Sequence, residues 1–436
     1  MKIAIVGLGK LGAPMAAVLA SAGHQVTGYD LDEGTVTAIR NGKASVDETG
    51  LQSTIDASEG RLTATTNLSE ALKDASLSIV IVPTPSREDG GFDATYAVEA
   101  VTQIGECLRG SNTDHVISLA STVLPGTTCG EIRQALEKSC GQSLSSSDCN
   151  IGLCYNPAFI ALGSVIHDLR NPDLVLIGGE DRHTADVVEN AWRAVWENEP
   201  TVAHLATIDA ELAKISVNSF VTMKISFANT IAELCENMPG ADAAAVLSAI
   251  GHDSRIGRKY LMPGLGFGGP CFPRDNYAFS RFAQDVGQTA PLANATDEVN
   301  KRQVERILKR IKASLPEGKS IAVLGLSYKP GTSVILESQA VDLAADLIAA
   351  GYETRVWDPA ALDNARQTLT AEVIFSQSLE AATDNVNAVI VATPWPEIVH
   401  FVNALSGQDA APELIVDLWH CIDAKDGQQL ITIGMP

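Results

Sequence analysis

A single cysteine lies in the segment from residue 266 to 275, GFGGPCFPRD, among three glycines and two prolines. A thiolate is a strong nucleophile that nearby cationic and backbone N–H groups stabilise. Because this segment has few bulky side chains, its backbone N–H groups can approach the sulfur of Cys271 and any oxyanion formed beside it. We therefore interpret Cys271 as a catalytic nucleophile; the alternative is a tight turn with an incidental cysteine.

A second set of polar residues lies in a long segment with apolar residues at three- and four-residue steps, DAELAKISVNSFVTMKISFANTIAELCENM. This spacing predicts one continuous helix, which places Lys214 and Asn218 on one face together with Glu211. Lys214 can polarise an alcohol or stabilise an oxyanion, Asn218 can orient a water, and Asp275 can orient Lys214 or that water. A solvated salt-bridge face is the alternative for such a pair, and the cysteine segment favours the catalytic interpretation.

The N-terminal segment predicts a dinucleotide site. An apolar strand, KIAIV, leads into Gly7, Gly9 and Gly12 in G-x-G-x-x-G spacing, and a helix and a second strand ending at Asp30 follow. The glycines allow a tight turn, close approach of a pyrophosphate and close packing of helix on strand, and the acid meets a ribose hydroxyl. Asp30 has no Lys or Arg at the next few positions, which favours NAD over NADP.

Two further strands are expected at LSIVIVPTP (77–85), closing on Thr84, and HVISLASTVLPGTT (115–128), closing on Ser121 and Thr122. Ligands of open parallel sheets collect at the carboxyl ends of strands, so Thr84, Ser121 and Thr122 are candidate contacts of cofactor or substrate. Threonine is also common in strands for its β-propensity alone, and the sequence leaves both explanations open.

The C-terminal third repeats this design. SIAVLGLS, ETRVWDP and AVIVATP echo the N-terminal strands, but Ser327 replaces the second glycine, so we expect this half to bind something other than a dinucleotide. The predicted fold class is α/β, with two Rossmann-like doubly wound domains joined by a long central helix. The expected parts are an NAD-binding domain (1–200), a helical dimerisation region with the cysteine loop (201–310) and a substrate domain (311–436).

Composition limits the partners. With 31 Lys plus Arg against 53 Asp plus Glu, the formal net charge of −22 argues against nucleic acid and anionic lipid as ligands. No apolar run is long enough to span a membrane, and we expect a cytoplasmic protein. The eight cysteines contain no CxxC pair, so we expect reduced thiols, no metal site, and mostly buried positions with Cys271 as the exception.

Over essentially its whole length the chain resembles the UDP-glucose/GDP-mannose dehydrogenase family, through these segments in this order: GLGKLG, VPTP, STVLPGTT, NPAFIALGSVIHDLRNPDLVLIGG, AELAKISVNSF, RIGRKYLMPGLGFGGPCFPRD and LGLSYKPGT. The resemblance implies NAD-dependent four-electron oxidation of a nucleotide-sugar primary alcohol to a carboxylate, through a thiohemiacetal and a thioester on Cys271. It also implies a homodimer built on the central helix, with Arg255 reaching across it.

The same resemblance implies roles for individual positions. The catalytic residues would be Cys271, Lys214, Asn218, Asp275 and Thr122. The cofactor contacts would be Gly7, Gly9, Leu11, Gly12, Asp30, Thr84, Ser121 and Thr122. The substrate contacts would be Phe159, Ile160, Lys214, Asn218, Arg255, Phe267, Gly268 and Lys329.

The chain departs from the family pattern at several positions. Ala158 and Leu162 stand where the family usually has glutamates, one of them implicated in thioester hydrolysis, so that role has no candidate residue. Ala120 stands where a lysine is common, and Leu336 where an arginine would meet an anionic ligand. The substrate therefore need not be UDP-glucose.

Two other hypotheses fit parts of the sequence. A two-electron dehydrogenase of the hydroxyisobutyrate or phosphogluconate type shares the opening segment and a Lys–Asn pair on a helix, but leaves residues 260–436 unexplained. A homologue that binds NAD without catalysis would account for Ala158, Leu162 and Leu336, but gives no reason for Cys271, Lys214, Asn218 and Asp275 to occur together.

Overall fold

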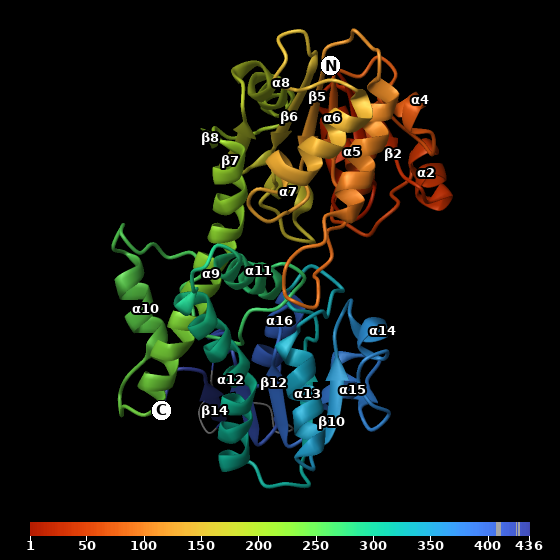
Figure 1. Ribbon diagram of the computed structural model, residues 1–436. Helices are drawn as coiled ribbons and strands as arrows, with labels where there is room; N and C mark the ends of the chain where they lie inside the picture. The colour runs from red at the N-terminus through yellow and green to blue at the C-terminus, as the bar shows by residue number, and fades with distance from the viewer. Residues whose placement is uncertain (407–410, 424, 426–427) are drawn as a thin grey trace. The chain divides into compact units, whose positions relative to one another are not determined.

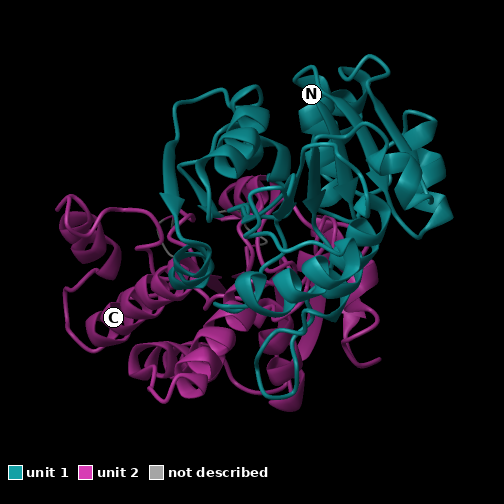
Figure 2. Ribbon diagram, turned by 45° about the horizontal axis from the view of Figure 1, so that its top comes forward, with its two compact units in different colours: residues 1–216 teal, residues 217–436 magenta. Residues whose placement is uncertain are grey.

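The computed structural model describes residues 1–406, 411–423, 425 and 428–436. The chain divides into two compact units, residues 1–216 and 217–436, and the division falls inside one long helix, α9 (Thr207–Glu236) (Figure 2). The sequence predicted this helix from its apolar periodicity.

Unit 1 is built on an eight-stranded sheet in the order β3-β2-β1-β4-β5-β6-β7-β8, in which only the β6–β7 pair is antiparallel within the described residues. The order reverses at β1, so the carboxyl ends of β1 and β4 flank a crevice of the kind that binds ligands in open α/β sheets. The strands are β1 (Lys2–Val6), β2 (Gln25–Tyr29), β3 (Leu62–Thr65), β4 (Leu77–Val80), β5 (His115–Leu119), β6 (Ile151–Tyr155), β7 (Leu174–Gly179) and β8 (Thr201–Leu205).

Helices cover both faces of this sheet (Figure 1). One apolar core joins the sheet to α1, α2, α3, α7 and α8, and a second core on the opposite face joins it to α4, α5 and α6. The helices are α1 (Gly12–Ser21), α2 (Glu33–Arg40), α3 (Leu51–Asp56), α4 (Leu68–Leu72), α5 (Thr95–Leu108), the π-helical segment η1 (Thr128–Ile132), α6 (Arg133–Cys140), α7 (Val165–Arg170) and α8 (Arg182–Arg193).

Unit 2 contains a six-stranded parallel sheet in the order β11-β10-β9-β12-β13-β14. This is the order of one complete doubly wound Rossmann sheet. Its strands are β9 (Ser320–Leu324), β10 (Glu353–Trp357), β11 (Ile374–Phe375), β12 (Ala388–Val391), β13 (Leu414–Asp417) and β14 (Gln429–Thr432). The predicted fold class, two doubly wound α/β sheets with a long connecting helix, is confirmed.

The helices of unit 2 fall into two groups. The C-terminal part of α9 packs with α10 (Ala243–Gly251), α12 (Pro291–Ser314) and α13 (Gln339–Ala349) in one large apolar core that includes β9 and β10. A smaller core lies on the other face of the sheet, under α15 (Leu379–Thr383) and α16 (Pro396–Leu405). The remaining helices are α11 (Phe272–Asp285), which begins directly after Cys271, and α14 (Leu362–Ala365).

Among the described residues, no helix is both long and apolar enough to cross a lipid bilayer.

Candidate active site

The glycine turn after β1 has the geometry that its sequence predicts. Gly7 has φ +98°, and a Cβ there would lie 2.5 Å from the Ile81 carbonyl oxygen. A Cβ on Gly12 would lie 1.9 Å from the Gly7 carbonyl oxygen, so any side chain would force α1 away from the turn. A Cβ on Gly9 would meet no atom within 4 Å, which leaves the backbone open to a ligand. The turn therefore fits a dinucleotide pyrophosphate at the start of α1.

Asp30 lies at the end of β2, facing this turn. One carboxylate oxygen accepts a hydrogen bond from the Leu8 N–H at 2.7 Å, and the other accepts one from the Asp32 N–H at 2.9 Å. These two bonds fix the carboxylate at the edge of the turn, where a ribose hydroxyl of the cofactor would meet it. NAD supplies a hydride acceptor when it is bound there.

The loops after β4 and β5 are bonded to each other. The Ser121 hydroxyl accepts from the Val82 N–H at 2.9 Å and donates to the Val82 carbonyl at 2.7 Å. The Thr84 hydroxyl donates to the Thr122 carbonyl at 2.7 Å. β4 ends at Val80, so Thr84 lies in the loop rather than at the strand end. The predicted strands therefore run too far: Thr84, Ser121 and Thr122 all follow the ends of β4 and β5, and the hydroxyls of Thr84 and Ser121 join the two loops at the sheet's switch point.

Lys214 is nearly buried on α9, with 7% of its surface exposed. Its ammonium donates to the Ala158 carbonyl at 2.8 Å and lies 4.3 Å from the centre of the Phe159 ring. The segment that contains Ala158, Ile160 and Leu162 packs on the apolar core of unit 1. A backbone carbonyl and an aromatic face therefore hold the ammonium beside a segment whose side chains at 158 and 162 are apolar.

Asn218 follows Lys214 by one turn of α9 and bonds a buried carboxylate in unit 2. Its side-chain amide donates to Asp275 at 2.7 Å, and Asp275 is 1% exposed. The neighbouring residue repeats the pattern, because the Ser219 hydroxyl donates to the Asn276 side chain at 3.0 Å. Two successive pairs thus fix α11 against α9, and the partner of Asp275 is the Asn218 side chain.

Cys271 lies one residue before α11, and its carbonyl accepts the Asp275 N–H at 2.8 Å in the first helical turn. Cys271 is exposed to solvent. The start of a helix presents backbone N–H groups, which favour negative charge nearby. Pro273 in the first turn suits the helix start, where its missing N–H costs nothing. Cys271 is therefore an accessible thiol one helical turn from the buried Asn218–Asp275 pair.

The glycines before Cys271 allow close packing. A Cβ on Gly268 would lie 2.0 Å from the Glu337 carbonyl oxygen, and one on Gly269, at φ +81°, would lie 2.5 Å from the Tyr328 ring. Side chains from α12 and α13 also bind the loop's backbone: Gln339 accepts the Gly266 N–H at 2.7 Å, and Asn300 accepts the Phe267 N–H at 2.8 Å. The loop is thus shaped by its fit against α12, α13 and the loop residues Tyr328 and Glu337.

The other predicted substrate residues lie in varied surroundings. Phe267 is buried, Gly268 and Lys329 are half-buried, and Leu336 is exposed, with its carbonyl accepting the Gly269 N–H at 2.9 Å. The Arg255 side chain is 87% exposed and pairs with Asp253 at 2.7 Å. The apolar side chain of Leu336 therefore lies next to the cysteine loop.

One expectation about the cysteines is wrong. We expected most of them to be buried with Cys271 as the exception, but Cys107 and Cys129 are exposed as well. Those that do lie in the core are Cys140, Cys154 and Cys235, and burial raises the pKa of Cys154 to about 12. Exposure alone therefore does not single out Cys271; its position at the start of α11 does.

In the second sheet, backbone and side-chain groups of the protein occupy the hydrogen-bonding positions of the acid that follows β10. Asp358, at the end of β10, is 1% exposed. Its carboxylate accepts hydrogen bonds from the Leu326 N–H at 2.7 Å, the Ser327 N–H at 3.0 Å and the Trp395 indole at 3.2 Å. The group that corresponds to Asp30 is thus saturated inside the protein, which supports the expectation that this half binds no dinucleotide.

Comparison with known proteins adds the family. Residues 1–196 match the NAD binding domain of the UDP-glucose/GDP-mannose dehydrogenase family, residues 208–302 its central domain, and residues 322–424 its UDP binding domain. The chain belongs to this family. It is therefore an NAD-dependent oxidoreductase of the nucleotide-sugar dehydrogenase type.

Individual relatives are similar over nearly their whole length. The chain is 34% identical to a UDP-glucose 6-dehydrogenase of Haloferax volcanii, over 99% of this chain and 97% of that protein. It is 32% identical to a GDP-mannose 6-dehydrogenase of Pseudomonas syringae pv. tomato, over 82% of this chain and 81% of that protein. A solved UDP-glucose dehydrogenase from Pyrobaculum islandicum matches with a TM-score of 0.89 and 31% identity, covering 100% of this chain and 98% of that one.

Sequence reasoning in this family member missed several supporting residues. Asn300 and Gln339, which bind the backbone of the cysteine loop, carry no local signal, because they come from helices far along the chain. The sequence also gives no signal for the contact of Lys214 with the Ala158 carbonyl, because any residue at position 158 supplies the same backbone carbonyl. The periodicity puts Glu211 on the face of Lys214, but it carries no signal for the partners of Glu211, the Gly126 and Thr128 N–H groups.

Proposed function

We propose that this chain oxidises the primary alcohol of a nucleotide sugar to a carboxylate in two successive oxidations, with Cys271 holding the intermediate covalently. The observation that carries this proposal is the arrangement in unit 2: an accessible thiol at the start of α11, one turn before a buried carboxylate that is bonded to Asn218. A two-electron dehydrogenase needs no such thiol.

The reaction balances with the residues present. Oxidation of the alcohol to the aldehyde transfers one hydride to NAD and releases one proton. The Cys271 thiolate then adds to the aldehyde carbon to give a thiohemiacetal, whose oxidation transfers a second hydride and leaves a thioester. Water cleaves the thioester, which frees the thiol and the carboxylic acid.

We assign roles to the surrounding residues on the same basis. The Lys214 ammonium stabilises the oxygen that carries negative charge during each step, and the Asn218–Asp275 pair orients the groups that exchange protons. Thr122, in the loop joined to Thr84, contacts the water or the cofactor. With Ala158 and Leu162 on the apolar core, the residue that activates the hydrolytic water differs from the glutamate usual in the family.

We also propose the three-part division named above, with an NAD-binding domain, a helical middle and a nucleotide-sugar-binding domain. The family matches at 1–196, 208–302 and 322–424 support it, as does the saturated Asp358 turn. The cytoplasmic location stays an expectation from the sequence.

The experiment that tests the proposed substrate class is a panel of UDP-, GDP- and CDP-sugars with NAD, followed by NADH absorbance. We expect at least one nucleotide sugar to be oxidised and the corresponding free sugars and 2-hydroxy acids to be inert. Turnover of a hydroxy acid would favour the two-electron alternative, and NADH binding without turnover across the panel would favour the non-catalytic one.

The homodimer is a further part of the proposal. In unit 2, α9 exposes Phe220, Phe227 and Leu234, which are 59%, 48% and 57% exposed and recur every seven residues along one face. A stripe of this kind packs well against a second copy of the same helix. The apolar Met238, 56% exposed, continues it beyond the helix end.

Phe227→Glu is therefore expected to convert a dimer into a monomer, because it places a charge in the middle of the stripe. Sedimentation velocity measures the change, and Val286→Glu is the matched control, since Val286 is 54% exposed outside α9. A Phe227→Glu protein that sediments like the wild type would show that this stripe is not the interface.

A further inference from the structure

We propose that Glu211 is a positioning residue that fixes the loop carrying Thr122 against the turn of α9 carrying Lys214. This inference rests on the proposed function, because it assigns no new reaction and concerns the placement of two of its residues. All residues in the argument belong to unit 1.

The loop after β5 contains a tight turn. The Thr127 N–H bonds the Leu124 carbonyl at 3.1 Å, Pro125 occupies the second position, and Gly126 has φ +93° at the third. This is the arrangement of a type II turn. The turn is followed directly by η1, whose first N–H groups have no partner within the helix.

Glu211 supplies that partner. Its two carboxylate oxygens accept the Gly126 N–H at 2.6 Å and the Thr128 N–H at 2.8 Å. The carboxylate thus binds the backbone N–H groups at the start of η1, which is interrupted by a kink at Gly130 before α6 begins. A residue of α9 therefore holds the turn and the start of η1, 83 residues away in the sequence.

The Glu211 carboxylate is buried, so its hydrogen bonds must compensate the cost of removing it from water. Glu211 is fully buried, and burial raises the pKa of its carboxyl group. Among the residues that the structure describes, Glu211 forms no ion pair. A buried carboxylate is costly unless hydrogen bonds compensate it, so the two backbone N–H groups are its main compensation.

The loop is held at both ends. Before the turn, Ser121 bonds Val82 and the Thr122 carbonyl accepts the Thr84 hydroxyl. After the turn, Glu211 holds Gly126 and Thr128, and Lys214 follows Glu211 by one helical turn on the same face of α9. Because Thr122 lies between the two anchors, the position of Thr122 relative to Lys214 depends on the Glu211 bonds.

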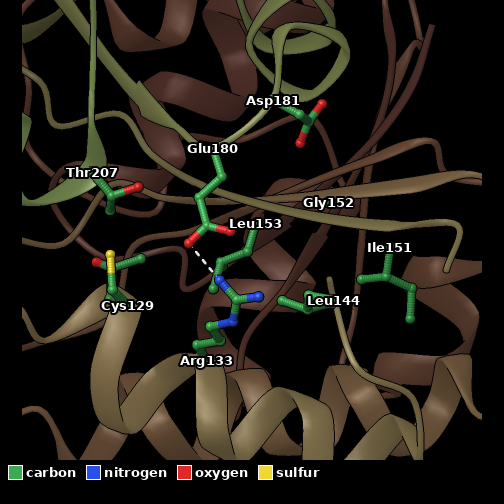
Figure 3. Close-up of a pocket in the computed structure, with 10 residues that line it drawn as sticks. Cys129, Arg133, Leu144, Ile151, Gly152, Leu153, Glu180, Asp181 and Thr207 are labelled. Carbon is green, nitrogen blue, oxygen red and sulfur yellow. Dashed lines mark hydrogen bonds and ion pairs between the residues drawn. The ribbon is translucent and has the colours of Figure 1, made fainter. Parts of the chain in front are cut away.

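A small cavity adjoins this junction. It measures about 30 Å³ and is lined by residues that include Thr128 and Cys129 of η1 and Thr207 at the start of α9. Figure 3 shows the Cys129 and Thr207 side chains on its wall, together with the Arg133–Glu180 ion pair. The cavity is far too small for a nucleotide sugar, and it adjoins the end of the loop at Thr128.

The test compares Glu211→Gln with Glu236→Gln. Glu236 serves as the control, because it also lies on α9, its side chain is 8% exposed, and it accepts a backbone N–H from Gly434 at 2.9 Å; unlike Glu211 it also pairs with Arg306 and Arg310. In Glu211→Gln we expect kcat to fall about 100-fold with a much smaller change in KM, since displacement of a reacting group by about 1 Å costs that much. Glu236→Gln should keep the wild-type kcat.

Amide hydrogen exchange gives the local readout. Exchange at residues 122–128 should accelerate in Glu211→Gln and stay unchanged in Glu236→Gln, which separates loss of the anchor from general destabilisation. If Glu211→Gln does not fold, Glu211→Asp tests the same point, because its shorter side chain does not reach both N–H groups and should lower kcat in a folded protein.

The inference is overturned if a folded Glu211→Gln or Glu211→Asp protein keeps wild-type kcat, or if Glu236→Gln loses as much. Its failure is distinct from failure of the proposed function. The former leaves two oxidations that depend on Cys271, whereas the latter would appear as full activity without that thiol.

Discussion

Cys271→Ser is expected to lower the rate of carboxylate formation on the order of 10³-fold or more, because a serine hydroxyl is a much weaker nucleophile than a thiol near neutral pH. The first oxidation, from alcohol to aldehyde, needs no covalent intermediate and is expected to continue slowly. The products, separated by chromatography after reaction with NAD, should therefore contain aldehyde where the wild type gives carboxylate.

The matched control for this variant is Cys107→Ser. Cys107 is also exposed, but it lies at the end of α5 in unit 1, where its sulfur bonds the Ser69 hydroxyl. It should retain wild-type rates. Equal carboxylate formation by Cys271→Ser and the wild type would mean that the thiol is incidental and that the second oxidation proceeds without a covalent intermediate on Cys271.

Gly269→Ala is expected to lower kcat about 100-fold, although it changes one methyl group and no reactive atom. The Cβ would lie 2.5 Å from the Tyr328 ring, so the loop must move before Cys271 can be placed. The backbone strain at φ +81° adds about 1 to 2 kcal/mol to the cost for any residue with a side chain. Steady-state kinetics and thermal denaturation measure the two effects separately.

Gly318→Ala separates strain from contact. Gly318 has φ +82°, but a Cβ there meets no atom within 4 Å. Both variants should lose similar stability from the backbone, and only Gly269→Ala should lose activity as well. Equal kcat in the two variants would contradict the idea that the fit of the glycine loop places the thiol.

The sequence predicts the geometry of the glycine turn after β1 well because local rules govern it. Gly7 and Gly12 have no room for a side chain, and Asp30 bonds the turn that it follows. Each of these features depends on residues within one strand–helix–strand unit. The periodicity of α9 is a local signal too, and it placed Lys214 and Asn218 one turn apart.

The rest depends on contacts between segments that are distant in the sequence. The fit of Gly268 and Gly269 involves Glu337 and Tyr328, and the bond of Lys214 is to a backbone carbonyl at residue 158. Such contacts leave no periodic pattern, because a carbonyl or a ring edge serves whatever the neighbouring residue is. The exposure of Cys107 and Cys129 does not follow from the sequence either, because a small polarisable cysteine side chain is tolerated both in a core and on the surface.

The second sheet shows how a repeated pattern can change its use. Gly325, at φ +90°, makes the same turn as Gly7, but Ser327 and Asp358 close it with internal hydrogen bonds. The substitution of one glycine was enough to predict that this half differs from the first. The saturation of Asp358 by Leu326, Ser327 and Trp395 gives the physical reason.

The most direct test of the central claim is the number of NADH molecules formed for each nucleotide sugar consumed, measured to completion with excess NAD. Two successive oxidations through Cys271 predict two NADH and one carboxylate for each sugar. One NADH for each sugar, with an aldehyde or ketone as the final product of the wild-type enzyme, would contradict the account.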